Sequence, residues 1–389
     1  MFQLYPPNQS YGYLMTRARP LSAAAVLIVL MVALPVTGAA LAGKPIGGYL
    51  KCPPQAGFVA HAPFSWPAFV VLAIACGLLL APFIRGMFAK EPHEHGDPPT
   101  SRPYPWWGWA GLALCVAAWV LSWTRLSWFA GLQRYTFAPL WVSYVLTVNA
   151  LRYRREGRCM MLDRPRFFLF LFLPSAVFWW FFEYLNGFVH SWYYLGIAHL
   201  SSTQYFILAS LPFSTVLPAV IGTYELLDTP RMRARAEALL TSRLPSPRRV
   251  AIAMLVLAGA GLALIGVLPD YLFPLVWISP ALIFAAIYVL RDRTFPSVMP
   301  PVLRRQIVLL PLAALICGCF WEMWNFYSLA KWKYEIPLVG GFHIFEMPLL
   351  GYLGYLPFGW ECGLIAAFVE RLTSERQPAD ASEIGRKVD

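Results

Sequence analysis

The chain has 389 residues, of which 58% are hydrophobic and 13% are charged, and its formal net charge is +11. Soluble domains carry about 25% charged residues, so this composition excludes an ordinary soluble enzyme. An aromatic content of 16% and long apolar runs exclude a disordered chain. The composition predicts a polytopic helical membrane protein of the all-α class.

Ten apolar segments are long enough, or nearly so, to cross a bilayer as helices. They cover residues 21–42, 66–86, 105–123, 137–151, 167–186, 204–226, 251–268, 271–290, 306–325 and 345–368. The first segment follows Arg17 and Arg19 and ends in Ala40-Leu41-Ala42, a pattern that a cleaved signal peptide would share. We favour a retained helix, because the run is long for a signal peptide and its retention keeps the topology consistent.

Lys and Arg concentrate on one side of these segments. With the N-terminus inside, the inner segments hold 25 of the 31 basic residues and the outer segments hold six. Cytoplasmic loops of membrane proteins carry such an excess. We therefore expect a multi-pass protein of the bacterial inner membrane with both termini in the cytoplasm. A basic excess of this kind faces anionic lipid, and it implies no nucleic-acid partner.

Two parts of the chain, residues 135–194 and 271–334, share an ordered series of residues. The matched pairs are Trp141 with Trp277, Glu183 with Glu322, Asn186 with Asn325, Trp192 with Trp332, and Tyr194 with Tyr334. The tripeptide Leu-Pro-Phe also recurs later, at 211–213 and 356–358. Chance does not readily produce such a series, so we interpret it as a tandem duplication of a four-helix unit.

This duplication predicts how the chain is divided. Residues 1–104 would form a transmembrane hairpin and a cytoplasmic linker, residues 105–228 the first repeat, residues 229–370 the second repeat, and residues 371–389 a cytoplasmic tail. Each repeat has an even number of helices, so both copies should have the same orientation in the membrane. A pseudo-twofold axis along the membrane normal would relate them, as in transporters with parallel repeats.

The two matched glutamates are the first candidates for chemistry. Glu183 and Glu322 fall about 25 Å along their helices, inside a hydrocarbon core about 30 Å thick. Asn186 and Asn325 share their helix faces, and His190 extends the first stripe. A carboxyl in the membrane is costly unless it is paired or neutral, so it marks a functional site by default. The alternative is a protonated Glu that bonds the Asn of the other repeat and locks the halves together.

The last predicted helix, 345–368, contains two prolines and four glycines, which predict a broken or closely packed helix. It carries Glu346 near its outer end and Glu361 near the middle of the membrane. One hypothesis is that these two and Glu322 share a cavity in which at least one stays neutral and donates a proton. The alternative is a set of separate, satisfied polar positions. We interpret the aromatic segments that follow both glutamate helices as lids over this cavity or as interfacial belts.

The pattern resembles the small integral-membrane lycopene cyclases, which are carotenoid cyclases built from tandem copies of a three-helix unit. The resemblance would cover predicted helices 4–6 and 8–10 and is carried by Glu183, Trp192, Tyr194, Glu322, Trp332, Tyr334, Glu346 and Pro348. That family has Pro-x-Glu-Glu where this chain has Phe345-Glu346-Met347-Pro348. The resemblance therefore extends to architecture only.

These features predict an integral-membrane enzyme that acts on an apolar isoprenoid or another lipid through carbocation chemistry. The catalytic candidates are Glu183, Glu322, Glu346 and Glu361, and the substrate-binding candidates are Asn186, His190, Trp192, Tyr194, Asn325, Trp332 and Tyr334. We find no metal-binding or nucleotide-binding motif, and we expect no cofactor. The alternatives are a proton- or cation-coupled transporter and a non-catalytic membrane assembly protein.

Overall fold

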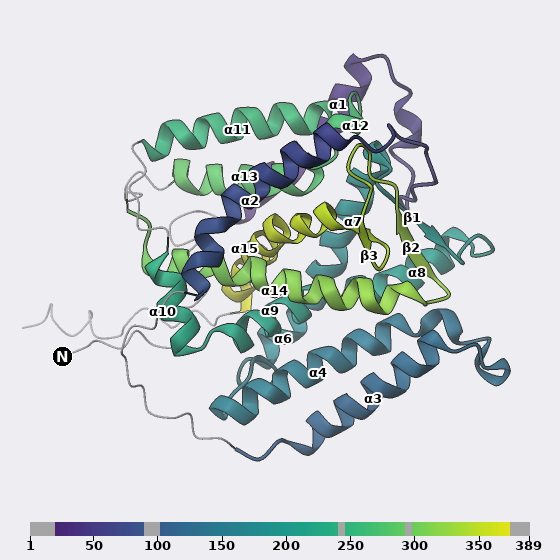
Figure 1. Cartoon of the computed structure of the whole chain (residues 1–389), viewed down its shortest axis with the longest axis vertical. Coiled ribbons are helices and arrows are strands. Elements are labelled where there is room, and N and C mark those ends of the chain that lie inside the picture. Colours follow the sequence, from purple (N-terminus) through teal and green to yellow (C-terminus); the bar gives the residue numbers. More distant parts are fainter. Residues whose placement is uncertain (1–19, 89–101, 240–245, 292–297, 374–389) are drawn as a thin grey trace, which may run out of the picture.

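The computed structural model describes residues 20–88, 102–239, 246–291 and 298–373, and these residues are mostly helical (Figure 1). The predicted cytoplasmic tail beyond Thr373, both chain ends and residues 89–101 of the predicted linker lie outside the described residues.

The structure contains the following helices and strands. The long helices are α1 (Pro20–Leu41), α2 (Trp66–Phe88), α3 (Trp106–Trp123), α4 (Phe137–Glu156), α7 (Phe172–Val189), α8 (Ser202–Phe213), α9 (Val216–Leu227), α11 (Pro247–Leu264), α13 (Leu275–Arg291), α14 (Pro301–Phe326) and α15 (Tyr355–Thr373). The short helices are η2 (Ile46–Gly48), η3 (Ser127–Phe129), η4 (Gln133–Tyr135), α5 (Met160–Asp163), α6 (Pro165–Phe170), α10 (Pro230–Ala238), α12 (Pro269–Leu272) and η5 (Leu349–Gly354). The strands are β1 (Trp192–Leu195), β2 (Lys331–Tyr334), β3 (His343–Ile344) and β4 (Met347–Pro348).

Seven helical segments of the described residues are long and apolar enough to cross a membrane. They are Trp66–Gly86, Trp106–Trp123, Pro165–Val189, Ser202–Leu227, Pro247–Leu264, Pro301–Phe326 and Leu349–Thr373. Two more apolar helices, Val29–Leu41 and Leu275–Leu290, are shorter, and α4 is not among the seven. The expectation of a helical, multi-pass membrane protein is confirmed, whereas the expected number of about ten spans is not.

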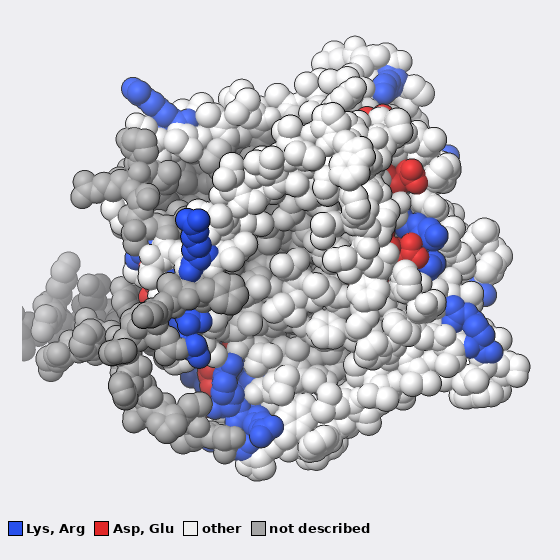
Figure 2. Space-filling view, viewed as in Figure 1, with Lys and Arg blue, Asp and Glu red and all other residues white. Residues whose placement is uncertain are grey.

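Charged side chains lie at two opposite ends of the molecule, with a broad uncharged zone between them (Figure 2). One end, here called the strand end, carries β1 to β4. The other, here called the arginine end, carries an ion-pair network. Arg164 contacts both Glu225 and Glu370, and Arg305 and Arg233 both contact Asp228. An apolar belt between two charged ends is what a bilayer requires of an integral membrane protein.

The structure is mostly helical, as predicted, but the aromatic segments after the two glutamate helices form short strands. β1 and β2 pair antiparallel, with Trp192 opposite Tyr334 and Tyr194 opposite Trp332. The second segment continues into the β3–β4 hairpin. Backbone groups that leave a helix still need partners, and this ladder supplies them. The strands that follow the two glutamate helices, one in each predicted repeat, thus contact each other directly.

The last predicted helix begins later than its sequence suggests. Residues 345–348 belong to the β3–β4 hairpin, a 3₁₀ turn follows, and α15 starts at Tyr355. The expectation of close packing is met at Gly359, where an added Cβ would lie 2.4 Å from the Leu310 carbonyl oxygen of α14. Pro311 cannot donate to the carbonyl of Ile307, and the Trp360 indole N–H donates to it instead, at 2.9 Å.

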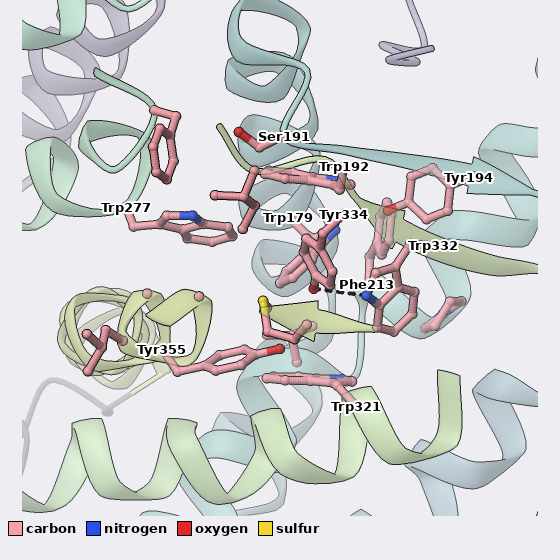
Figure 3. Close-up of a pocket in the computed structure, with 18 of the residues that line it drawn as sticks. Trp179, Ser191, Trp192, Tyr194, Phe213, Trp277, Trp321, Trp332, Tyr334 and Tyr355 are labelled. Carbon is pink, nitrogen blue, oxygen red and sulfur yellow. Dashed lines mark hydrogen bonds between the residues drawn. The ribbon is translucent and has the colours of Figure 1, made fainter. Parts of the chain in front are cut away.

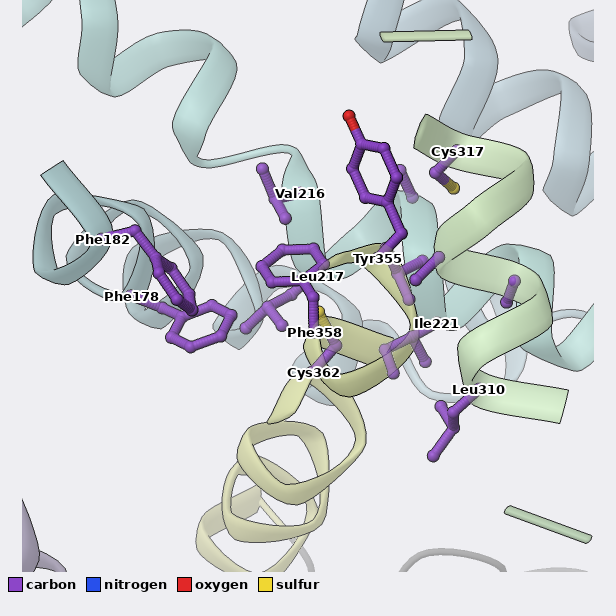
Figure 4. Packing of buried hydrophobic residues seen from close by; sticks show 14 of the residues in the cluster. Phe178, Phe182, Val216, Leu217, Ile221, Leu310, Cys317, Tyr355, Phe358 and Cys362 are labelled. Atoms are coloured by element: carbon purple, nitrogen blue, oxygen red, sulfur yellow. The ribbon is translucent and has the colours of Figure 1, made fainter. Parts of the chain in front are cut away.

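The core lies where α7, α9, α14 and α15 meet (Figure 4). Phe358 of α15 stacks on Phe178 of α7, with ring centroids 5.5 Å apart. Leu217 and Ile221 of α9 and Cys317 of α14 are fully buried beside them. The tightly packed centre is therefore built from the glutamate-bearing helices and the helices that follow them.

By contrast, α2 is loosely attached. No residue between Trp66 and Gly86 is buried. Its strand end is held by a hydrogen bond from the Ser65 N–H to the Leu338 carbonyl, at 2.8 Å, and its other end contacts α10. A helix with this little packing inside the protein presents most of its surface to lipid.

Candidate functional site

A cavity of about 520 Å³ lies on the strand side of the core, bordered by α2, α7, α8, α13, α14, both strands of the β1–β2 ladder and the start of α15 (Figure 3). Its wall is mainly apolar and rich in aromatic residues. The aromatic residues that line it include Trp179, Trp192, Tyr194, Tyr205, Phe213, Trp277, Trp321, Trp332, Tyr334, Tyr355 and Trp360. Ligand cavities of this size usually hold a small molecule among apolar walls with a few placed polar groups.

Glu183 lies behind this wall and is completely buried. Its Oε1 accepts three hydrogen bonds, from the Tyr194 hydroxyl at 2.5 Å, the Trp179 indole at 3.0 Å and the Trp192 indole at 3.1 Å. Among the described residues, its Oε2 has no hydrogen-bond partner. All three donors line the cavity, whereas Glu183 itself does not. The carboxyl thus reaches the cavity only through aromatic donors.

Glu322 repeats this arrangement on the other side of the ladder. It is completely buried, and its Oε1 accepts from the Tyr334 hydroxyl at 2.8 Å and the Tyr355 hydroxyl at 2.9 Å. The Trp332 indole donates to the Tyr334 hydroxyl at 2.9 Å, a bond that Figure 3 marks. The Oε2 of Glu322 also has no hydrogen-bond partner among the residues that the structure describes. Tyr334, Tyr355 and Trp332 line the cavity, and Glu322 does not.

Tyr355 stands where the first copy has Trp179. Trp179 precedes Glu183 by four positions, and the residue four before Glu322 is Gly318. A Cβ at Gly318 would lie 2.4 to 2.7 Å from three ring atoms of Tyr355. The glycine therefore makes room for a tyrosine from α15, which supplies the donor that Trp179 supplies to Glu183.

The two asparagines fix the strands to their helices. Asn186 donates to the Trp192 carbonyl at 2.7 Å and accepts from the Trp192 N–H at 3.3 Å. Asn325 makes the same pair of bonds with Trp332, at 2.8 and 2.9 Å. Each amide therefore bonds the strand that follows its own helix and not the Glu of the other predicted repeat, so the alternative of a Glu–Asn lock is wrong. Neither asparagine lines the cavity.

The structure does not bring Glu346 and Glu361 into the cavity with Glu322. Glu346 lies in the β3–β4 turn and pairs with Lys331 at 2.5 Å and Lys333 at 3.9 Å. Glu361 is completely buried inside α15, and its carboxyl oxygens have no hydrogen-bond partner in the part of the chain that the structure describes. None of the four predicted glutamates is among the lining residues. The expected cavity of shared acids is replaced by an aromatic one.

His190 ends α7 in the left-handed conformation, with φ 53°, and its side chain turns away from the cavity toward the carbonyl of Gly57, 3.2 Å away. Burial lowers the pKa of His190. The nearby His61 bonds Asp270 at 2.6 Å and the His190 carbonyl at 3.3 Å. These contacts join the loop before α2 to the strand end, and sequence reasoning missed them because the three residues are far apart in the chain.

Four predicted binding residues do line the cavity: Trp192, Tyr194, Trp332 and Tyr334. Burial, followed by the charge of the neighbouring glutamate, raises the pKa of both tyrosines well above the usual range. Both hydroxyls therefore keep their protons and act as donors.

Sequence reasoning missed Trp179, Tyr205 and Tyr355. The Gly318 position of the second copy was the only signal for Tyr355. Trp179 lies one turn before Glu183, which was a signal that the repeat comparison could have used.

In the described parts of the chain, no group of three or more His, Cys, Asp or Glu side chains could hold a metal ion. Comparison with protein-family models, with curated proteins and with solved structures gives no match to this chain.

Proposed function

We propose that this protein is an integral-membrane enzyme that binds an apolar isoprenoid or another lipid in the aromatic cavity and acts on it by acid chemistry. The observation that carries the proposal is the wall itself. Three tyrosines, Tyr194, Tyr334 and Tyr355, line an apolar cavity, and the hydroxyl of each hydrogen-bonds a buried glutamate. Such a site combines space for hydrocarbon with a short route for a proton.

The proton would pass through a tyrosine, because the carboxyls do not border the cavity. With Glu322 protonated, its hydrogen bond with Tyr334 is reversed, so that the carboxyl donates to the hydroxyl oxygen. Tyr334 then gives its hydroxyl proton to a carbon–carbon double bond and takes the proton of Glu322 in one concerted step. The π electrons form the new C–H bond, which leaves a carbocation and a carboxylate. Loss of a proton from a carbon next to the cation, by the same route in reverse, forms a new double bond. The net reaction is an isomerisation or a cyclisation and needs no other reactant.

The aromatic wall suits the cation that this step creates. A cation over the face of an indole or phenol ring is stabilised by about 2 kcal/mol or more when water is excluded. Trp277, Trp321 and Trp192 border the cavity, and Trp277 stacks on Phe182 and Trp192 at 4.6 and 5.5 Å. The ring stacks hold these faces in place.

We also propose that the site arose by duplication. Residues matched in the sequence make matched contacts, since Asn186 and Asn325 bond equivalent strands. The ladder register fits a pseudo-twofold axis, because Trp192 faces Tyr334 while its counterpart Trp332 faces Tyr194. The aromatic contacts between the predicted repeats follow the same symmetry. Trp141 packs on Trp321 at 4.8 Å, and its counterpart Trp277 packs on Phe182, the residue before Glu183. The copies would share one orientation in a bacterial inner membrane, with both termini in the cytoplasm.

Mass spectrometry of co-purifying lipid tests the enzyme proposal. The wild type is compared with Tyr334→Phe and Glu322→Gln, and with the control Tyr153→Phe, whose hydroxyl contacts Arg102 far from the cavity. We expect an enriched isoprenoid that is converted by the wild type and the control and accumulates unchanged in both site variants. Lipid composition that is the same in all four samples would refute the proposal.

A second candidate is a non-catalytic membrane protein in which the glutamates only hold the fold. It is favoured by the burial of Glu183 and Glu322 behind the wall. In that case Glu183→Gln and Glu322→Gln would lower the free energy of unfolding by several kcal/mol and leave the bound lipid unchanged.

A further inference from the structure

One charged residue stands out among the described residues that line the cavity. Arg134, in η4, is the only Asp, Glu, Lys or Arg among them. No carboxylate of the described residues lies within ion-pair distance of it, and its buried Nε has no hydrogen-bond partner there. A half-buried cation without an anion beside an apolar cavity is costly unless a ligand completes it.

The position of Arg134 is fixed by its neighbours. Gln133 donates to the carbonyls of Leu121 and Ser122 at 2.6 and 3.0 Å, which ties η4 to the end of α3. Arg134 Nη1 lies against His199 Nε2, in the loop between β1 and α8. The guanidinium thus gives the cavity a charged end, whereas His199 is exposed and is not among the lining residues.

We propose that the cavity takes an amphiphile with one apolar chain and an oxyanion headgroup, phosphate or carboxylate, held by Arg134. This inference rests on the proposed function and narrows its substrate class. The planar guanidinium presents paired donors that match both kinds of oxyanion. The chain lies among the tryptophans and tyrosines, while the headgroup remains at the strand end.

The test uses three ligands with one chain, geranylgeranyl phosphate, geranylgeranoate and geranylgeraniol, and the protein in phosphatidylcholine nanodiscs. Binding is followed by quenching of tryptophan fluorescence, since several tryptophans line the cavity. A charge-assisted hydrogen bond contributes enough to change affinity by about 10- to 100-fold. We expect at least one anion to bind the wild type more tightly than the alcohol by that factor, and the tighter anion identifies the headgroup.

Substitutions assign the effect to Arg134. Arg134→Gln should reduce the affinity for the anions to that for the alcohol and leave the alcohol unchanged, and Arg134→Lys should keep part of the preference. The control is Arg125→Gln in the same loop, because Arg125 donates to the carbonyls of Ser122, Thr124 and Tyr327 and does not line the cavity.

Equal affinities for all three ligands in the wild type would overturn the headgroup site but leave the proposed function standing. An equal loss in Arg125→Gln and Arg134→Gln would also overturn it. If none of the three ligands binds, the headgroup site and the proposed function both fail.

Discussion

Gly318→Ala is the sharpest perturbation that the structure offers, because it adds a single methyl group against a rigid ring. The new Cβ would lie 2.4 to 2.7 Å from three ring atoms of Tyr355, closer than real contacts allow. Tyr355 cannot swing away cheaply, since its ring stacks on Trp321 with centroids 5.9 Å apart and its hydroxyl bonds Glu322 at 2.9 Å. The ring must move and the hydrogen bond must break.

The cost follows from these two events. Overpacking a well-filled site costs about 1–3 kcal/mol. Leaving a buried hydroxyl or carboxyl without its partner costs about 1–3 kcal/mol more. We therefore expect Gly318→Ala to lower the free energy of unfolding by about 2–6 kcal/mol, and to weaken lipid binding because Tyr355 borders the cavity.

The assay is denaturation in mixed micelles, followed by tryptophan fluorescence. Gly187→Ala is the matched control, because Gly187 lies in the equivalent helix α7 with open space around its Cβ position. Alanine favours a helix over glycine by about 1 kcal/mol, so this control should be neutral or stabilising. In a Tyr355→Ser background, which lacks the ring that the new methyl group would strike, Gly318→Ala should cause little further loss. A Gly318→Ala protein as stable as Gly187→Ala would refute the placement of the Tyr355 ring and its role beside Glu322.

Three further predictions concern other contacts. Asn186→Ala or Asn325→Ala leaves a buried backbone N–H and C=O of the following strand unpaired. Each substitution should therefore lower the free energy of unfolding by about 2–5 kcal/mol. A loss below about 0.5 kcal/mol in the same assay would contradict the described bonds. Burial lowers the pKa of His190, so the unfolded chain takes up its proton first. The contribution of His190 to stability should therefore fall as the pH drops below about 6.5 and stay constant above it. The difference between the wild type and His190→Asn in thermal unfolding at several pH values measures this contribution. Cys76 of α2 lines the cavity and Cys319 does not. Bound lipid should therefore slow maleimide labelling of a variant whose only cysteine is Cys76, and should not affect a variant whose only cysteine is Cys319. Equal protection of both would argue against ligand in the cavity.

The amino-acid sequence determined the membrane character of this chain and the identity of its paired residues. Hydropathy is a local property, so long apolar runs predicted most of the spanning helices, including α3 and α14. The spacing of Glu183, Asn186, Trp192 and Tyr194 is local as well, and these residues do contact one another. Their recurrence in the second half predicted that Glu322 and Tyr334 would also meet.

Only the tertiary structure decided what surrounds these groups. The strand pairing of Trp192 with Tyr334 and the donation from Tyr355 to Glu322 join segments that are distant in the sequence, and helical periodicity carries no information about them. The same is true of Arg134, which has no acidic neighbour among the described residues because of how the loops at the strand end are arranged. Hydropathy and spacing tell which residues a membrane helix buries. Whether a buried carboxyl faces a cavity or the back of an aromatic wall depends on how the helices pack, because side chains from several helices fill the space between them.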